Sequence, residues 1–86
     1  MDNPFMNSVE YIKRSVSRLI NEYNDEIEME IIQYPDHYKV VVTICQERPP
    51  YKDIIGIGTD RRSARRAARN ALKGLYLEAY SEGKNH

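Results

Sequence analysis

The sequence has no tryptophan, and only one cysteine and one phenylalanine among its 86 residues. A single thiol can neither close a disulfide within the chain nor supply a zinc site built from several cysteines, so the fold depends on neither device. Such cysteine usage is typical of reducing compartments, and we expect an intracellular, cytoplasmic protein. We interpret Cys45 as a small buried hydrophobic residue rather than as a nucleophile.

Long hydrophobic runs are also absent. No apolar stretch approaches the roughly 18 residues that a membrane-spanning helix requires, and the first residues lack the basic and apolar segments of a secretory signal. A chain of 86 residues has room for one small domain. We expect a single domain over residues 1–86, with its core in residues 7–80 and a flexible tail at residues 81–86.

The chain carries no net charge, because 13 lysine and arginine residues balance 13 aspartate and glutamate residues. Neutrality argues against indiscriminate binding of polyanions, but the two signs are separated along the sequence. Residues 22–36 contain acids and no lysine or arginine, whereas residues 61–73 contain bases and no acid. This separation creates local electric fields that the net charge conceals. The basic segment contains Arg61, Arg62, Arg65, Arg66, Arg69 and Lys73.

A helix is predicted from Asn7 to Asn24. Asn7 and Glu10 have the spacing of a capping box. The apolar side chains that follow recur at steps of three and four residues, as on one face of a helix. Asn24 and Asp25 favour turns and would end it. The apolar stripe contains Val9, Ile12, Val16, Leu19, Ile20 and Tyr23.

Three strands are predicted after that helix. Alternating apolar residues indicate strands over residues 27–34 and 37–45, which a turn at Pro35 and Asp36 would join as a hairpin. A shorter strand is predicted over residues 51–58. Its glycines, Gly56 and Gly58, permit either an unusual turn or the close approach of another part of the backbone.

Asp60 is the predicted N-cap of a second helix, whose inner face is rich in alanine. Small side chains would let this helix approach the sheet closely, and its basic side chains would lie on nearly the opposite side. The expected fold is α+β, of order αβββα, with a three-stranded antiparallel sheet and two helices packed on one face. The inner face contains Ala64, Ala67, Ala68, Ala71, Leu72, Leu75 and Ala79.

The basic second helix has two explanations. Its cations could merely solvate an outer helix face, but no glutamate between residues 61 and 77 balances them. A helix start attracts anions through its free N–H groups and its dipole, and Arg61, Arg62 and Arg65 surround this one. Because guanidinium groups match phosphate oxygens in pairs, we favour a phosphate-binding role.

Three short motifs resemble the double-stranded RNA-binding domain family. The residues GIGTDRRSARRAARNAL are similar to its G-x-G pair, polar cap, K-K-x-A-K cluster and alanine-rich helix, with Arg61, Arg62 and Arg65 at the basic positions. The residues LINEY at 19–23 resemble a motif of the family's first helix, and PDH at 35–37 resembles its first hairpin loop. The resemblance covers residues 9–76.

This resemblance implies non-catalytic binding of double-stranded RNA, read by shape and phosphates with little sequence specificity, across about 16 base pairs. By this likeness the arginines would bind phosphates across the major groove. His37 would meet 2′-hydroxyls in one minor groove, or would instead only cap its loop, and the first helix would meet the other minor groove. The implied RNA-binding residues are Arg61, Arg62, Arg65, Arg66, Arg69, His37, Asn21 and Glu22.

A protein–protein interaction or dimerisation module on the same fold is the alternative, since domains that resemble this family can lose RNA binding. The separated acidic and basic faces suit pairing with a partner or with a second copy. The strand over residues 51–58 would form a sheet edge, with Ile54 and Ile55 available to a partner.

The residues give little support to an enzyme. His37 and Cys45, the one plausible base–nucleophile pair, would lie too far apart along one strand to meet. Asp36 and Asp53 lack the further ligands that a metal ion needs, and the sequence has no phosphate-binding loop of the P-loop kind. We expect no enzymatic activity, no cofactor and no membrane partner, and double-stranded RNA as the ligand.

Overall fold

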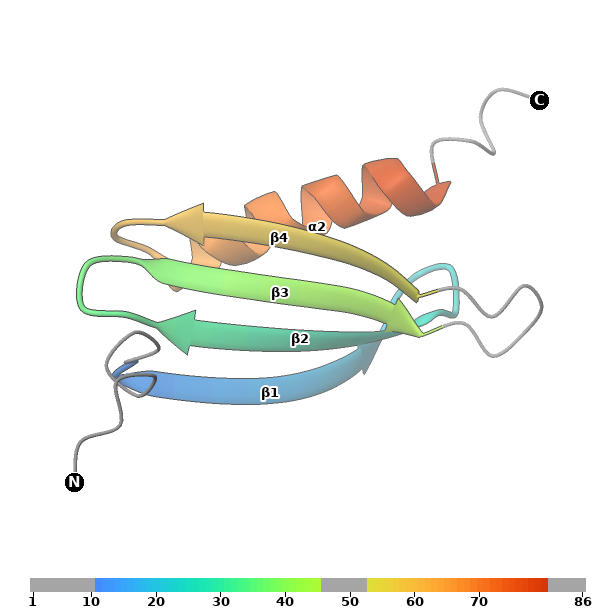
Figure 1. Cartoon of the computed structure of the whole chain (residues 1–86). Coiled ribbons are helices and arrows are strands. Elements are labelled where there is room, and N and C mark those ends of the chain that lie inside the picture. Colours follow the sequence, from blue (N-terminus) through green and yellow to red (C-terminus); the bar gives the residue numbers. More distant parts are fainter. Residues whose placement is uncertain (1–10, 46–52, 81–86) are drawn as a thin grey trace.

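The computed structural model describes residues 11–45 and 53–80, which contain four strands and one helix. The strands are β1 (Lys13–Ile20), β2 (Glu26–Gln33), β3 (Tyr38–Cys45) and β4 (Asp53–Asp60), and the helix is α2 (Ala64–Tyr80). The strands pair antiparallel in one sheet of order β1-β2-β3-β4. The helix lies along one face of this sheet, over β3 and β4 (Figure 1).

The predicted order αβββα is therefore wrong, and the described chain has the order ββββα. The segment expected to form the first helix contains β1, which pairs with β2 from Lys13 opposite Gln33 to Ile20 opposite Glu26. The proposed capping residues Asn7 and Glu10 lie outside the described residues. The sheet consequently has four strands instead of three, and among residues 11–45 and 53–80 α2 is the one helix on the face that two helices were expected to share.

The apolar spacing was misleading because a step of four residues suits both structures. Ile12, Val16 and Ile20 follow one another at this step, which keeps side chains on one face of a helix and equally on one face of a strand. Serine on either side of Val16 also weakens helix formation. Pairing with β2 then favours the strand through backbone hydrogen bonds and two ion pairs across it, Arg14 with Glu30 and Arg18 with Glu26.

The turn between β1 and β2 is organised by Asn21. Its Oδ1 accepts hydrogen bonds from the backbone N–H groups of Tyr23, at 2.9 Å, and of Asp25, at 2.9 Å. Asn24 has a φ of 66°, in the left-handed region that asparagine tolerates better than most residues. The prediction that Asn24 and Asp25 turn the chain is confirmed, although a strand precedes them and not a helix.

The remaining predicted elements are confirmed with shifted ends. β2 and β3 correspond to the predicted hairpin, whose turn is closed by the Tyr34 N–H donating to the carbonyl of His37 at 2.8 Å. β4 corresponds to the strand predicted over residues 51–58, of which residues 51 and 52 lie outside the described part. α2 continues without interruption through Gly74.

The core lies between α2 and the adjoining part of the sheet. Side chains alternate between the two faces of a strand, so every second residue of β2 and β3 points toward the helix. The face of α2 that meets them is rich in alanine, as predicted. The buried core residues are Ile27, Val40, Val42, Ile44, Ala67, Ala71 and Leu75.

The backbone of α2 approaches β4 at two glycines. A Cβ atom added to Gly58 would lie 2.2 Å from the carbonyl oxygen of Ala67 and 2.4 Å from the backbone nitrogen of Ala71. One added to Gly56 would lie 2.3 Å from the carbonyl oxygen of Ala71. Neither glycine has a positive φ. Of the two reasons considered for these glycines, close backbone approach is therefore the one that applies.

Three tyrosines fasten the C-terminal end of α2 to the turn between β1 and β2. The ring of Tyr80 lies 4.2 Å from that of Tyr23 and 5.1 Å from that of Tyr76. The Tyr80 hydroxyl accepts a hydrogen bond from Asn21 Nδ2 at 2.8 Å and donates one to Asp25 Oδ2 at 2.6 Å. Burial, together with the adjacent Asp25 carboxylate, raises the pKa of Tyr80 to about 12.

This raised pKa predicts a loss of stability in alkaline solution. The phenol titrates near pH 10.0 in the unfolded chain and near pH 12 in the folded one, so its contribution is complete below pH 10 and disappears as the pH rises to 12. We expect the free energy of unfolding to fall by about 2 kcal/mol more in the wild type than in a Tyr80→Phe variant over this range. Urea denaturation at a series of pH values measures this difference. Parallel pH profiles would contradict it.

Candidate nucleic-acid interface

Two side chains shape the start of α2. Asp60 Oδ2 accepts hydrogen bonds from the backbone N–H groups of Arg62, at 2.9 Å, and Ser63, at 2.8 Å, which fixes the turn after β4. Ser63 Oγ accepts one from the N–H of Arg66 at 3.1 Å, so Ser63 and not Asp60 is the N-cap. The bonds from Arg62 and Ser63, with the nearby arginines, hold the pKa of Asp60 below its ordinary value.

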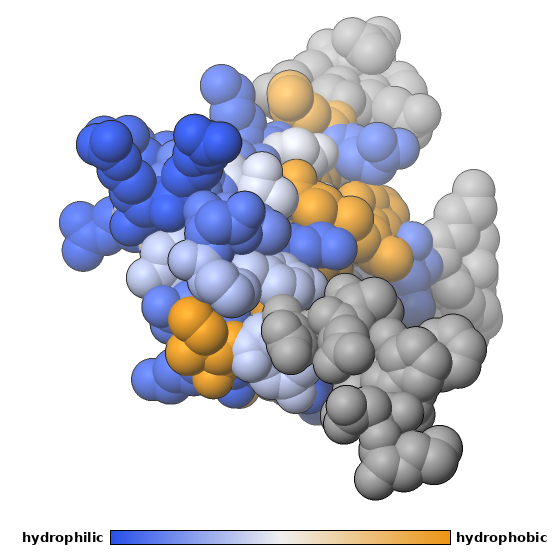
Figure 2. Space-filling model, turned by 60° about the vertical axis from the view of Figure 1, so that its left-hand side comes forward, coloured by the Kyte–Doolittle hydropathy of each residue, from blue (hydrophilic) through white to orange (hydrophobic). Residues whose placement is uncertain are grey.

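Six exposed cations follow Asp60, in the turn before α2 and along the helix; we call them the basic row. Arg65, Arg69 and Lys73 succeed one another at steps of four and so lie along one side of the helix. None of the six takes part in the ion pairs found among the described residues. Figure 2 shows strongly hydrophilic side chains gathered on one side of the molecule. The basic row comprises Arg61, Arg62, Arg65, Arg66, Arg69 and Lys73.

The tertiary structure brings His37 beside the first member of this row. His37, Asp36, Thr59, Asp60 and Arg61 line one open polar pocket of 430 Å³, at the end of the sheet where β2 turns into β3 and β4 leads into α2. Two predicted site residues from opposite halves of the sequence therefore share one site. Thr59 joins them there, although sequence reasoning gave it no role, because only the pairing of β3 with β4 brings it near His37.

The His37 ring is held on two sides. It stacks on Tyr34, with ring centroids 4.7 Å apart and planes inclined by 15°. Its Nδ1 lies 2.7 Å from Asp36 Oδ1, and this hydrogen bond, with the charge of Arg61 contributing, lowers the pKa of Asp36. The side chain nevertheless retains 36% of its accessible surface. Nδ1 is engaged, so Nε2 is the ring atom available to a ligand.

The acids of residues 22–36 lie mostly away from the basic row. Ile27 is buried beneath α2, so Glu26, Glu28 and Glu30, at alternate positions of β2, point to the opposite face of the sheet. Their charges therefore do not line the helix surface that carries the arginines. Three acids do not lie on that opposite face of the sheet. Asp36 belongs to the pocket of His37 and Arg61, and Glu22 and Asp25 bond to Tyr76 and Tyr80 near the C-terminal end of α2.

Asn21 and Glu22, expected to contact RNA from a first helix, lie in the turn between β1 and β2, at the other end of the sheet from His37. Asn21 donates to the Tyr80 hydroxyl, and its Oδ1 accepts two backbone hydrogen bonds. Glu22 Oε1 accepts a hydrogen bond from the Tyr76 hydroxyl at 3.3 Å. Both side chains therefore join the tyrosine cluster, and the structure does not bring them together with the basic row.

β4 is the last strand in the order of the sheet, so the prediction that this strand forms a sheet edge is confirmed. Ile55 points away from α2 and is 56% exposed, whereas Ile54 packs against the core.

Cys45, beside β4 at the end of β3, is exposed, so its interpretation as a buried residue is wrong. Partial burial and the adjacent Asp53 raise the pKa of Cys45, which keeps its thiol protonated and weakly nucleophilic at neutral pH.

Comparisons of the chain with protein-family models, with curated proteins and with solved structures found no match. The resemblance to double-stranded RNA-binding domains therefore rests on the short motifs alone, and the first of its implied elements, the N-terminal helix, is replaced by β1 in the described residues. Within residues 11–45 and 53–80, no helix has the length and apolar character needed to cross a membrane.

Proposed function

We propose that this protein binds double-stranded RNA without catalysis, through the basic row and His37, inside the cell. The proposal is supported by a row of six exposed cations, free of ion pairs among the described residues, whose first member shares a pocket with a partly exposed, oriented imidazole. Phosphate contacts supply most of the affinity of such interfaces, and arginine is suited to them.

The dimensions of the basic row suit a duplex. Its helical members span residues 65–73, which corresponds to about 12 Å at the helical rise of ~1.5 Å per residue, and Arg61 and Arg62 extend the row into the preceding turn. In A-form RNA the major groove is deep and narrow, so its two phosphate strands face each other across a short distance. Arginines along one side of α2 can then contact both strands. The glutamates of β2 point to the other face of the sheet, so they would lie away from the phosphates of a duplex in this position.

His37 supplies the means of distinguishing RNA from DNA in this proposal. The pocket that it shares with Arg61 lies beyond the start of α2, where a duplex aligned with the basic row would present its shallow minor groove. Imidazole Nε2 can accept or donate a hydrogen bond to a 2′-hydroxyl, which DNA lacks. The proposal gives no RNA contact to Asn21 or Glu22, because their side chains are engaged by Tyr80 and Tyr76.

A gel-shift comparison tests the choice of nucleic acid. We expect the wild type to bind an RNA duplex of about 24 base pairs, longer than the ~16 that such recognition spans, more tightly than the DNA duplex of the same sequence. In a His37→Ala variant, the ratio of RNA affinity to DNA affinity should fall about tenfold. The salt dependence of binding should stay the same, since the phosphate contacts remain.

Equal binding of both duplexes by the wild type would reduce the proposal to general phosphate binding. A folded protein that binds neither duplex would exclude it. If the mass of that protein also rose with concentration in size exclusion, the alternative of an interaction module would be favoured, with the exposed Ile55 and Ile57 of edge strand β4 as its first candidate surface.

A further inference from the structure

α2 covers only half of the sheet face on which it lies. Four strands, each occupying ~4.8 Å of the sheet, form a face about 19 Å wide, and a helix with its side chains is about 10 Å wide. The helix packs on β4 and β3, touches β2 only slightly and makes no contact with β1. The helix-facing side of β1 and β2 is therefore uncovered by any described element, over a width that one further helix would fill.

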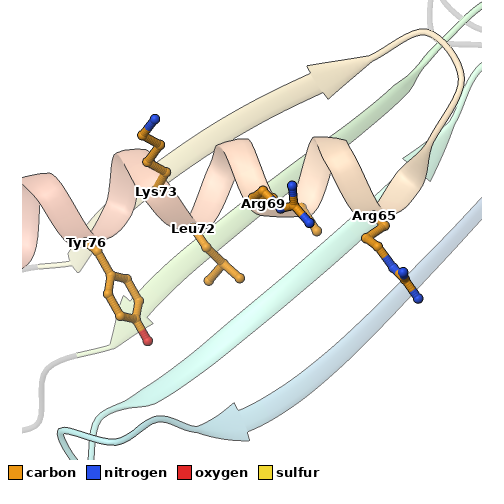
Figure 3. A pocket seen from close by; sticks show the side chains of 6 residues that line it. Arg65, Arg69, Leu72, Lys73 and Tyr76 are labelled. Atoms are coloured by element: carbon orange, nitrogen blue, oxygen red, sulfur yellow. The ribbon is translucent and has the colours of Figure 1, made fainter.

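Apolar side chains lie both on the flank of α2 and on the uncovered strip beside it; we call these two surfaces together the groove. Ala68, Leu72 and Tyr76 line a hollow of 610 Å³ on the flank of α2 that is turned toward β1 and β2 (Figure 3). On the sheet side, Met29 is half-buried and Leu19, which pairs with Ile27 and so faces the same way, is 40% exposed. An apolar surface of this kind favours a partner with an apolar stripe.

The groove is also cationic. Arg65, Arg69 and Lys73 border the same hollow, and Lys13 lies on the helix-facing side of β1. Along β1 and β2 the other polar residues on this side are uncharged, because the glutamates of β2 occupy the opposite face. One carboxylate, that of Glu22, lies at the C-terminal end of the hollow, where it accepts a hydrogen bond from Tyr76. An occupant must therefore match apolar side chains in the middle and positive charge along the rim.

We propose that this groove binds an amphipathic helix of a partner protein, with carboxylates flanking its apolar stripe. Such a helix would lie beside α2, complete the helical layer over the sheet and pair its acids with Arg65, Arg69 and Lys73. A second copy of this chain fits less well, because docking α2 against α2 would bring two rows of like charge together.

This docking does not depend on RNA binding, but it has a consequence for it. Arg65 and Arg69 belong to both the basic row and the rim of the groove. An acidic helix in the groove would neutralise these arginines, so helix and duplex should compete. The partner helix would then act as a regulator of RNA binding.

A designed peptide tests the groove directly. The probe is a fluorescein-labelled helix of about 18 residues, long enough to follow α2 at ~1.5 Å per residue, with leucines at helical spacing flanked by glutamates. Its control has lysine in place of each glutamate. We expect the acidic peptide to bind in fluorescence anisotropy and to shift the amide resonances of Ala68, Leu72 and Met29, and the basic peptide to bind at least tenfold more weakly.

Matched variants locate the site. Arg65→Glu and Leu72→Ala should each weaken binding of the acidic peptide about fivefold or more. Arg66→Glu and Leu77→Ala make the same changes on residues that do not line the hollow, and Leu77 is 58% exposed, so these controls should bind like the wild type. Any of four results would overturn the proposal. The folded wild type could bind neither peptide or bind both equally, or the variants and their controls could lose the same affinity. The protein could also form a dimer that the peptide does not dissociate.

Discussion

In a Gly58→Ala variant we expect the domain to unfold, or α2 to detach from the sheet, at temperatures where the wild type is folded. The added methyl group would lie 2.2 Å and 2.4 Å from backbone atoms of Ala67 and Ala71, far inside van der Waals contact. Backbone atoms of a helix cannot swing aside as a flexible side chain does, so the whole of α2 must shift. That shift would separate the alanine face of the helix from β4 and open the core.

The expected cost is about 3 kcal/mol or more, at the upper end of overpacking effects. A domain of this length has about 4–13 kcal/mol of total stability, so the substitution removes a large part of it. Urea denaturation followed by circular dichroism measures the change. Gly56→Ala should behave similarly, because its added Cβ would lie 2.3 Å from the carbonyl oxygen of Ala71.

Gly74 provides the matched control, because the same substitution there should have the opposite sign. Nothing lies within 4 Å of a Cβ added to Gly74, and its φ is not positive. Alanine in the interior of a helix is favoured over glycine by about 1 kcal/mol, so Gly74→Ala should stabilise the domain. A Gly58→Ala variant as stable as the wild type would show that α2 does not pack on β4 in the described way.

Reversing the charge of the basic row is expected to abolish RNA binding. An Arg61→Glu/Arg62→Glu/Arg65→Glu variant replaces three cations with three anions at the start of α2, where a duplex would place its phosphates. Each lost phosphate contact lowers the slope of log affinity against log salt by about one, and the new charges repel the backbone. We expect at least about a hundredfold weaker binding at moderate salt, measured by gel shift with the duplexes used for the wild type.

This loss should not arise from unfolding. α2 has no acidic residue in its first turn, and a glutamate there interacts favourably with the helix dipole, so Arg65→Glu leaves the helix at least as stable. As a charge-matched comparison, Arg61→Glu/Arg65→Glu and Lys13→Glu/Lys39→Glu change the net charge equally. Lys13 and Lys39 lie outside the basic row, on β1 and β3. If the two double variants lost the same affinity, net charge and not the basic row would control binding.

The candidate site has two parts: the basic row, which the local sequence specifies, and the pocket of His37, which it does not. The basic row was predictable because its members follow one another along a single helix, where the residue spacing fixes the geometry. The meeting of His37 with Arg61 and Thr59 depends on the register in which β3 pairs with β4. For Asn21 and Glu22 the prediction depended on a first helix. In the structure this segment forms β1 and the turn after it, so the two side chains lie elsewhere than expected.

By itself, the sequence determined β2, β3, β4 and α2, since in each of them the apolar period agrees with the local propensities. It also determined that the basic side chains lie opposite the alanine face. Only the tertiary structure decided the state of residues 13–20, because the step from Val16 to Ile20 fits a helix and a strand alike, and pairing with β2 selects between them. The tertiary structure alone also decided that α2 covers half of the sheet face. The position of α2 over the sheet is set by its close contact with Gly56 and Gly58, and not by any pattern along the chain.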